Sequence, residues 1–305
     1  MKELDRRRAR VSTGELAYVE EGDGPAVILV HGFPTNADLW RNLAPLLAPR
    51  FRVVAPDLLG YGWSAKPEDA DLSLENQVRS VRELLDDLEV GEFAAVGHGV
   101  GGGVAQLLAA DGGARTLVLL DSVAFDAWPP AGSVPALTDV AASSATPALA
   151  EQIVGEAFTR GMGHPERLLP EDLELFVRPW REDPAALVRA ARALDGRGLS
   201  DAARRVGKQK IPVLLVWGED DPWLPSSLAE RLQEEVAEAA LAVLPGCSHF
   251  VLEDAPETVT PLVFEFLRLR YLGESHAHAA PPTPVDLGVS FERPREPSGL
   301  PDEEG

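Results

Sequence analysis

The stretch FAAVGHGVGGG, residues 93–103, decides the fold. It opens with a short apolar run at 93–96 and continues into a turn rich in glycine. Beyond the turn, Val104, Leu107 and Leu108 recur at the spacing of one helix face. A short apolar run that ends in turn residues is typical of a buried strand in a parallel sheet. The stretch therefore predicts a strand that passes through a sharp turn directly into a helix.

Other parts of the chain repeat this alternation of strand and helix patterns. Short apolar runs predict strands at 26–30, 51–56, 93–96, 116–120, 213–217 and 240–244. Helical spacing of apolar residues predicts helices at 74–88, 227–235 and 257–271, and Ser73 is a suitable N-cap for the first of them. Strands and helices in alternation predict an α/β protein with a mostly parallel, doubly wound sheet and helices on both faces.

A long middle segment, 122–210, interrupts the alternation. It contains only loops and helical patterns, for example at 171–180 and 184–194. We expect this segment to form a helical cap inserted over the carboxyl edge of the sheet. The expected domains are then a core, made of 1–121 and 211–273, and a cap, made of 122–210.

The last segment, 274–305, differs in composition from the rest of the chain. It holds seven acidic residues and six prolines but few large apolar residues. A segment of this kind cannot bury enough apolar surface to fold, so we predict a disordered, acidic, Pro-rich tail. His276 and His278 are expected to be two solvated histidines of this tail, and no metal site is expected.

Composition also restricts the partners that the protein can meet. The chain carries 28 Lys and Arg against 49 Asp and Glu, a formal charge of −21. Nucleic acids and anionic membranes attract basic surfaces, so neither is expected as a partner. Cys247 is the single cysteine, which rules out an intrachain disulfide and favours a reducing compartment. The sequence shows no signal-peptide or membrane-spanning pattern, so we expect a cytoplasmic protein that meets a small-molecule substrate or ligand.

Four short motifs follow predicted strands in order along the chain. They are HGFP at 31–34, VGHGVGGG at 96–103, WGEDD at 217–221 and GCSHF at 246–250. Together they resemble the α/β-hydrolase superfamily, in particular its cap-bearing branch of epoxide-hydrolase-like and haloalkane-dehalogenase-like members. The resemblance covers about residues 11–272 and implies an α/β-hydrolase fold with an inserted helical cap. In open α/β sheets, ligands bind at the carboxyl ends of the strands, which is where these motifs are expected to lie.

The resemblance draws attention to the turn after the central strand, which in this family is a nucleophile elbow of the form G-x-nucleophile-x-G. Here the turn is Gly97-His98-Gly99-Val100-Gly101. The middle residue is normally Ser, Asp or Cys, whereas Gly99 has no side chain with which to attack a substrate. Glycine adopts a positive φ without strain, so the fold tolerates it. Loss of a triad nucleophile, however, can lower kcat by about 10⁶-fold.

The other functional positions of the family are occupied. The resemblance implies that His249 is the general base and that Asp221 is the acid that orients it, while Asp121 stands at the other position from which relatives supply the acid. It also implies an oxyanion hole formed by the backbone N–H groups of Phe33 and Val100. Backbone donors do not depend on side-chain identity, so the loss of a nucleophile leaves them in place. No cofactor is implied.

Aromatic residues bear on the type of reaction. Epoxide hydrolases of this branch use cap tyrosines, but the tyrosines of this chain lie outside the predicted cap: Tyr18, Tyr61 and Tyr271. Haloalkane dehalogenases usually place a halide-binding Trp after the nucleophile, where this chain has Val100. For Trp128 and Trp180 of the predicted cap, packing is favoured over a role in lining a pocket. An ester- or lactone-cleaving ancestry stays open.

Three functions follow from this pattern and remain open at this point. The first is a hydrolase for an ester, lactone or related bond, in which Gly99 replaces the nucleophile and covalent catalysis is lost or strongly reduced. The second is non-covalent catalysis, in which His249 and Asp221 activate a substrate or a water as a lyase, cyclase or direct hydrolase would. The third is a non-catalytic protein that binds or senses a small ligand.

Overall fold

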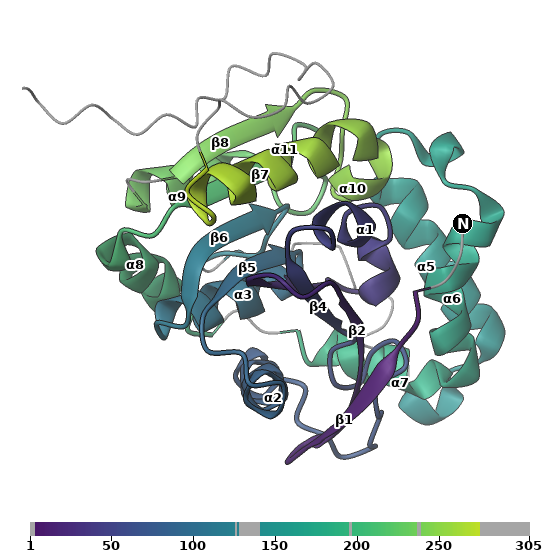
Figure 1. Cartoon of the computed structure of the whole chain (residues 1–305). Coiled ribbons are helices and arrows are strands. Elements are labelled where there is room, and N and C mark those ends of the chain that lie inside the picture. The colour runs from purple at the N-terminus through teal and green to yellow at the C-terminus, as the bar shows by residue number, and fades with distance from the viewer. Residues whose placement is uncertain (1–3, 126, 128–140, 195–196, 237–238, 275–305) are drawn as a thin grey trace, which may run out of the picture.

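The computed structural model describes residues 4–125, 127, 141–194, 197–236 and 239–274 (Figure 1). The predicted tail beyond Glu274, with His276 and His278, lies outside these ranges, as does Trp128. None of the helices in the described ranges has both the length and the apolar character that a membrane crossing requires.

The strands form one sheet of eight, in the spatial order β1-β2-β4-β3-β5-β6-β7-β8. Their bounds are β1 (Arg7–Val11), β2 (Gly14–Glu21), β3 (Ala26–Val30), β4 (Arg52–Pro56), β5 (Phe93–His98), β6 (Ala114–Leu120), β7 (Val213–Gly218) and β8 (Ala239–Leu244). Strands β3 to β8 pair in parallel, whereas β2 pairs antiparallel with both β1 and β4. The predicted mostly parallel, doubly wound sheet is confirmed.

Strand β3 lies at the centre of the sheet, and its residues are fully buried. Ile28 pairs with Val54 of β4 on one side and with Ala95 of β5 on the other. A parallel strand covered on both faces needs a continuous apolar run rather than an alternating one. This requirement explains why the run at 26–30 could be recognised from the sequence.

Helices cover both faces of the sheet (Figure 1). Their bounds are α1 (Ala44–Leu47), α2 (Leu74–Asp87), α3 (Val100–Ala110), α8 (Leu199–Gln209), α9 (Ser227–Glu235), α10 (Val251–Asp254) and α11 (Pro256–Arg270). Helix α3 packs against β5 and β6 and is flanked by α2 and α8, while α1 and α11 pack against each other on the opposite face. Helix α2 begins where predicted, because the Ser73 hydroxyl accepts a hydrogen bond from the N–H of Asn76.

Helices α5 (Pro147–Gly161), α6 (Pro170–Glu182) and α7 (Pro184–Arg192) occupy the stretch between β6 and α8. Each starts with proline, whose fixed φ and missing N–H suit the first turn of a helix. Helix α6 contacts the loop after β3: Trp180 Nε1 donates to the carbonyl of Pro34 at 2.6 Å, and Asn36 Nδ2 donates to the carbonyl of Leu175 at 2.9 Å. Helix α8 instead packs on α3 beside the sheet.

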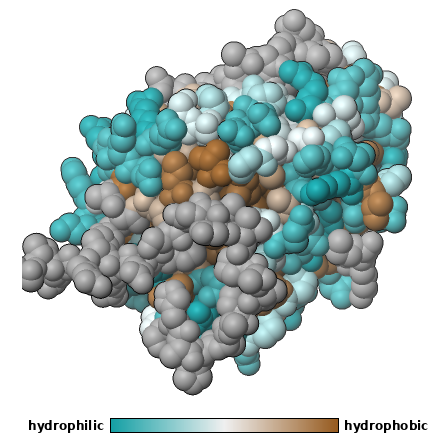
Figure 2. Space-filling model, turned by 90° about the horizontal axis from the view of Figure 1, so that it is seen from above, coloured by the Kyte–Doolittle hydropathy of each residue, from teal (hydrophilic) through white to brown (hydrophobic). Residues whose placement is uncertain are grey.

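The visible surface of the molecule is hydrophilic over most of its area. Seen from above, its most prominent apolar area lies beside the residues drawn in grey, and smaller apolar areas are scattered elsewhere (Figure 2).

Backbones approach closely where β5 turns into α3. A Cβ atom at Gly101 would lie 2.2 Å from the carbonyl oxygens of both Val30 and His31, and one at Gly97 would lie 2.4 Å from the carbonyl oxygen of Gly101. These distances are far below van der Waals contact, so the turn can form only if both positions lack a side chain. The strand-to-helix turn is therefore pressed against the carboxyl end of β3.

Replacing Gly101 with alanine should expose this constraint. We expect Gly101→Ala to destabilise the protein by about 1–3 kcal/mol, because the strand and the helix must move apart. Gly155→Ala is the matched control: Gly155 lies in helix α5 with no atom within 4 Å of the added Cβ. It should stabilise the protein by about 0.5–1 kcal/mol, since alanine is the better helix former. Urea denaturation measures both, and equal stability of the two variants would contradict the argument.

Candidate functional site

The centre of the site is a hydrogen bond between His249 and Asp221. His249 follows β8 and Asp221 follows β7, so both side chains come from the carboxyl edge of the sheet. The distance from His249 Nδ1 to Asp221 Oδ2 is 2.8 Å, and both side chains are buried. Because a carboxylate oxygen only accepts, Nδ1 carries the proton of this bond and Nε2 is left as the basic nitrogen of the neutral ring.

Backbone groups fix the carboxylate of Asp221 from its other side. Its Oδ1 accepts hydrogen bonds from the N–H groups of Trp223 at 2.8 Å and Leu224 at 3.0 Å. These bonds close the turn that Pro222 begins, so the same residue forms the turn and meets the histidine. Asp221 therefore presents Oδ2 to His249 in one orientation.

Gly99 lies at the turn between β5 and α3, opposite the histidine ring. Its backbone has φ 54° and ψ −124°, a conformation that strains any residue with a side chain. A Cβ built at Gly99 would lie 3.5 Å from His249 Nε2 and 3.5 Å from the Cα of Gly32, which are ordinary contact distances. Sterically, the position has room for a β-carbon, and that carbon would stand beside the basic nitrogen.

Two backbone amides flank this position. Val100 is the first residue of α3, so its N–H has no acceptor within the helix. Phe33 follows Gly32, whose own Cβ would lie 3.4 Å from the Cα of Gly99. Within the ranges that the structure describes, neither amide donates a hydrogen bond to the protein.

Two buried histidines shape the backbone around these amides. His98 Nε2 lies 2.9 Å from the carbonyl oxygen of His249, and since a carbonyl only accepts, Nε2 is the protonated nitrogen. Burial, together with the nearby His249, holds the pKa of His98 well below its usual range, so the ring is neutral. His31 Nε2 accepts from the N–H of Leu58 at 3.0 Å, while its Nδ1 donates to the carbonyl of Gly32 at 2.9 Å. Burial lowers the pKa of His31 too.

Asp121 is buried near Asp221 but does not meet the histidine. Its Oδ1 accepts from the N–H of Gly218 at 2.8 Å. Of the two positions from which the sequence could supply the acid, the structure places Asp221 on His249. Burial, then the negative charge of Asp221, raises the pKa of Asp121 well above its ordinary value.

Sequence reasoning missed several neighbours of the site. The ring of Trp223 packs edge-on against His249, with centroids 4.9 Å apart. Tyr61 lies outside the predicted cap, yet its ring packs 5.5 Å from that of Trp180 and 6.4 Å from that of Phe33. Trp180 itself is fully buried, in agreement with its expected packing role. For Trp223, the only sequence signal was its place directly after Asp221 and Pro222. For Tyr61, nothing in the sequence predicted its contact with α6.

Cys247, two residues before His249, is a poor substitute for a nucleophile. Burial raises the pKa of its thiol to about 11, so the reactive thiolate is scarce at neutral pH. Among the described residues, no group of three or more His, Cys, Asp or Glu side chains is arranged as a metal site.

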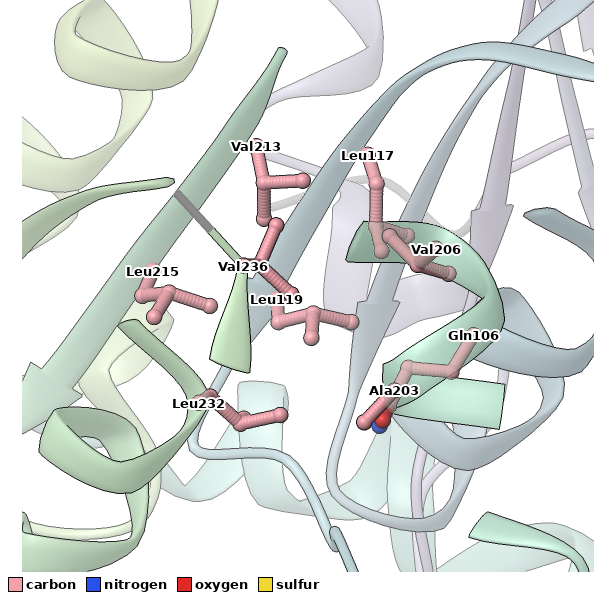
Figure 3. A pocket seen from close by; sticks show the side chains of 9 residues that line it. All are labelled: Gln106, Leu117, Leu119, Ala203, Val206, Val213, Leu215, Leu232 and Val236. Carbon is pink, nitrogen blue, oxygen red and sulfur yellow. The ribbon is translucent and has the colours of Figure 1, made fainter. Parts of the chain in front are cut away.

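A separate apolar hollow lies away from these residues (Figure 3). Side chains of β6, β7, α8 and α9 line it together with Gln106 (Figure 3), and its empty volume, which includes space open to solvent, is about 240 Å³. It contains none of the residues of the candidate site.

The raised pKa of Asp121 predicts how stability changes with pH. In the unfolded chain this carboxyl ionises near pH 4, whereas the fold resists its ionisation to higher pH. The contribution of Asp121 to the free energy of unfolding is therefore fully present below about pH 4. It is lost as the pH rises through the pKa that this carboxyl has in the folded protein. Asp121→Asn cannot ionise, so its melting temperature should rise relative to that of the native chain as pH increases. Asp201→Asn, at an exposed site, should show no such trend. A difference between Asp121→Asn and the native chain that is independent of pH would refute the argument.

Comparisons with known proteins identify the family to which this fold belongs. Residues 25–256 match the family model described as alpha/beta hydrolase fold. Haloalkane dehalogenase 2 of Mycobacterium tuberculosis is 29% identical over 286 residues, covering 83% of this chain and 92% of the relative. A soluble epoxide hydrolase from a Corynebacterium species is 27% identical over 297 residues, covering 87% of this chain and 97% of the relative.

A solved structure extends the agreement to three dimensions. The crystal structure of an alpha/beta hydrolase fold protein from Burkholderia ambifaria superimposes with a TM-score of 0.78 and 32% identity, covering 87% of this chain and 98% of that one. Sequence, topology and solved structures thus agree, and the chain belongs to the alpha/beta hydrolase fold family.

Proposed function

We propose that the chain carries the site of a small-molecule hydrolase, for an ester, lactone or related bond, from which the nucleophile has been lost. The observation that carries this proposal is the 3.5 Å distance between His249 Nε2 and a Cβ at Gly99. A serine or aspartate there would extend from a carbon already in contact with the base. Without it, covalent catalysis is absent or strongly reduced.

Each remaining group has a role in this proposal. Asp221 orients the His249 ring, and Nε2 accepts the proton from the attacking group and later returns it to the leaving group. The N–H groups of Phe33 and Val100 stabilise the negative charge that develops on the carbonyl oxygen. With Gly99, the reaction stops at its first step, because no side-chain oxygen is available to form the covalent intermediate.

We further propose that α5, α6 and α7 act as a cap that sets substrate choice. Their contacts support the assignment: Trp180 and Leu175 of α6 bond the loop around Phe33, and Gly161 at the end of α5 meets the loop that bears His249. Helix α8 packs on α3, so we place the end of the cap before α8 rather than at residue 210. One relative is named as a haloalkane dehalogenase and another as an epoxide hydrolase, and both names support a small-molecule substrate for this chain.

A second candidate function is non-covalent base catalysis. It is favoured by the space at Gly99, where a water near the Cβ position would lie close to His249 Nε2. The base would take a proton from this water, the resulting hydroxide would attack the substrate, and the amides of Phe33 and Val100 would bind the oxyanion. A third function, ligand binding without turnover, uses the same groups without a proton transfer.

Restoring the missing side chain tests the main proposal. Gly99→Ser and Gly99→Asp should raise kcat on esters, lactones or haloalkanes by up to about 10⁶-fold, since nucleophile loss costs that much in a triad. Stability should fall by about 1–3 kcal/mol, because the residue must adopt a positive φ. Gly99→Ala is the control, as it adds the β-carbon and the strain without a nucleophile. Folded Ser and Asp variants that match Gly99→Ala on every substrate would refute the proposal.

Removing the base from the native chain separates the three functions. If His249 activates water directly, the native chain turns over a substrate and His249→Ala abolishes the reaction, while Asp221→Asn lowers it because the ring loses its orientation. Steady-state assays against the same substrate panel, with calorimetry for ligand binding, provide the measurements. Turnover that is unchanged in His249→Ala would exclude base catalysis by His249. Tight ligand binding without turnover, in the native chain and in His249→Ala alike, would favour the binding role.

A further inference from the structure

The loop that carries His249 is held by hydrogen bonds on both sides of the histidine. The N–H of Phe250 donates to the carbonyl of Gly161 at 2.9 Å. The N–H of Ser248 donates to Asp254 Oδ2 at 2.8 Å. The residues before and after the base are therefore both held by hydrogen bonds within the buried interior.

Asp254 connects this loop to the turn that follows α5. Its side chain is fully buried and accepts two further backbone N–H groups, from Gly163 to Oδ2 at 2.9 Å and from His164 to Oδ1 at 2.9 Å. The backbone oxygen of Asp254 accepts from Arg167 at 2.6 Å. A carboxylate that accepts three N–H groups forms charge-assisted bonds, which are shorter and stronger than neutral ones.

Glycines let the two segments touch. A Cβ at Gly163 would lie 2.0 Å from the carbonyl oxygen of Gly246, and one at Gly161 would lie 2.7 Å from the ring of Trp223. The turn after α5 therefore rests directly on the loop at 246–249 and on the ring that packs against His249.

A column of rings forms a second connection. Phe176 of α6 stacks on Phe158 of α5 at 4.9 Å, Phe158 stacks on Phe250 at 4.3 Å, and Phe250 stacks on His98 at 5.6 Å. All four side chains are buried. The column runs from the cap helices through the residue after His249 to the residue before Gly99. Packed aromatic rings of this kind resist sliding, since each displacement loses contact with two neighbours.

We propose that Asp254 is a positioning residue that holds His249 in place, by fastening its loop to the turn at 161–164. The histidine lies between two anchored residues, so the position of its backbone follows from the position of the cap helices, while Asp221 orients the ring. The catalytic part of this inference rests on the proposed function, because it matters for turnover only if His249 takes part in the reaction. The structural part concerns the His249–Asp221 bond and holds in the native chain.

Asp254→Asn tests the inference with a change of almost no volume. The amide keeps one oxygen, but its NH₂ group must face a backbone N–H, so at least one of the three bonds is lost. Asp183→Asn is the matched control. Asp183 accepts the N–H of Ala186 at the start of α7, one of the three cap helices, and it does not contact the His249 loop. Asp254→Asn removes a buried carboxylate that accepts three backbone N–H groups, and Asp183→Asn removes a half-buried one that accepts one backbone N–H and pairs with Arg189.

Two measurements follow. In the native chain, the NMR signal of the His249 Nδ1 proton, identified by its loss in His249→Ala, should broaden or exchange faster in Asp254→Asn and stay unchanged in Asp183→Asn. In the Gly99→Ser chain, Asp254→Asn should lower kcat by about 10²-fold while KM changes little, because misplacing a catalytic group costs turnover rather than binding. If the signal changes but Gly99→Ser has no activity, the positioning role stands and the proposed function fails.

An unchanged Nδ1 signal in folded Asp254→Asn would overturn the inference, as would equal changes in Asp183→Asn. If Asp254→Asn does not fold, Asp254→Glu makes the same test, because the longer side chain keeps the carboxylate but moves its oxygens away from the N–H groups of Ser248 and Gly163. An unchanged Nδ1 signal in folded Asp254→Glu would then overturn the inference.

Discussion

The approach of three backbone segments at the carboxyl edge of the sheet determines everything else at this site. The turn from β5 into α3 presses on the end of β3 so closely that Gly101 has no room for a Cβ atom, and the turn itself is so tight that Gly97 has none either. This packing sets the amide of Val100 beside the loop of Phe33 and brings Gly99 opposite His249. The site is therefore a product of backbone packing.

The electrostatics of the site agree with this geometry. The two histidines behind the turn, His31 and His98, are neutral because burial lowers their pKa values, so neither competes for the charge of Asp221. The buried carboxyl of Asp121 resists ionisation, because burial and the neighbouring Asp221 raise its pKa. We infer that the chain has kept the means to orient a base and to stabilise an oxyanion, while the attacking atom must come from elsewhere or is absent.

Much of the fold could be predicted because buried parallel strands leave continuous apolar runs. The run at 26–30 and the helix at 227–235 have the predicted bounds, and the other predicted strands differ by a few residues at their ends. Strands β1 and β2 were missed. The five residues of β1 include three arginines, and the strand is mostly exposed, so it has neither an apolar run nor a regular alternation. β1 pairs with β2 because a short turn joins the two strands, and not because of a pattern of apolar residues.

The sequence by itself determined the family, the glycine at the turn, and which residue types could act there, since these follow from short motifs whose spacing is local. Only the tertiary structure decided that Asp221 rather than Asp121 meets His249, that Trp223 packs on the ring, and that Asp254 joins the loop to the end of α5. These contacts join residues on different elements, and several of those pairs lie far apart in the chain. Their distances depend on how strands, loops and inserted helices pack together, which no local pattern of residues encodes.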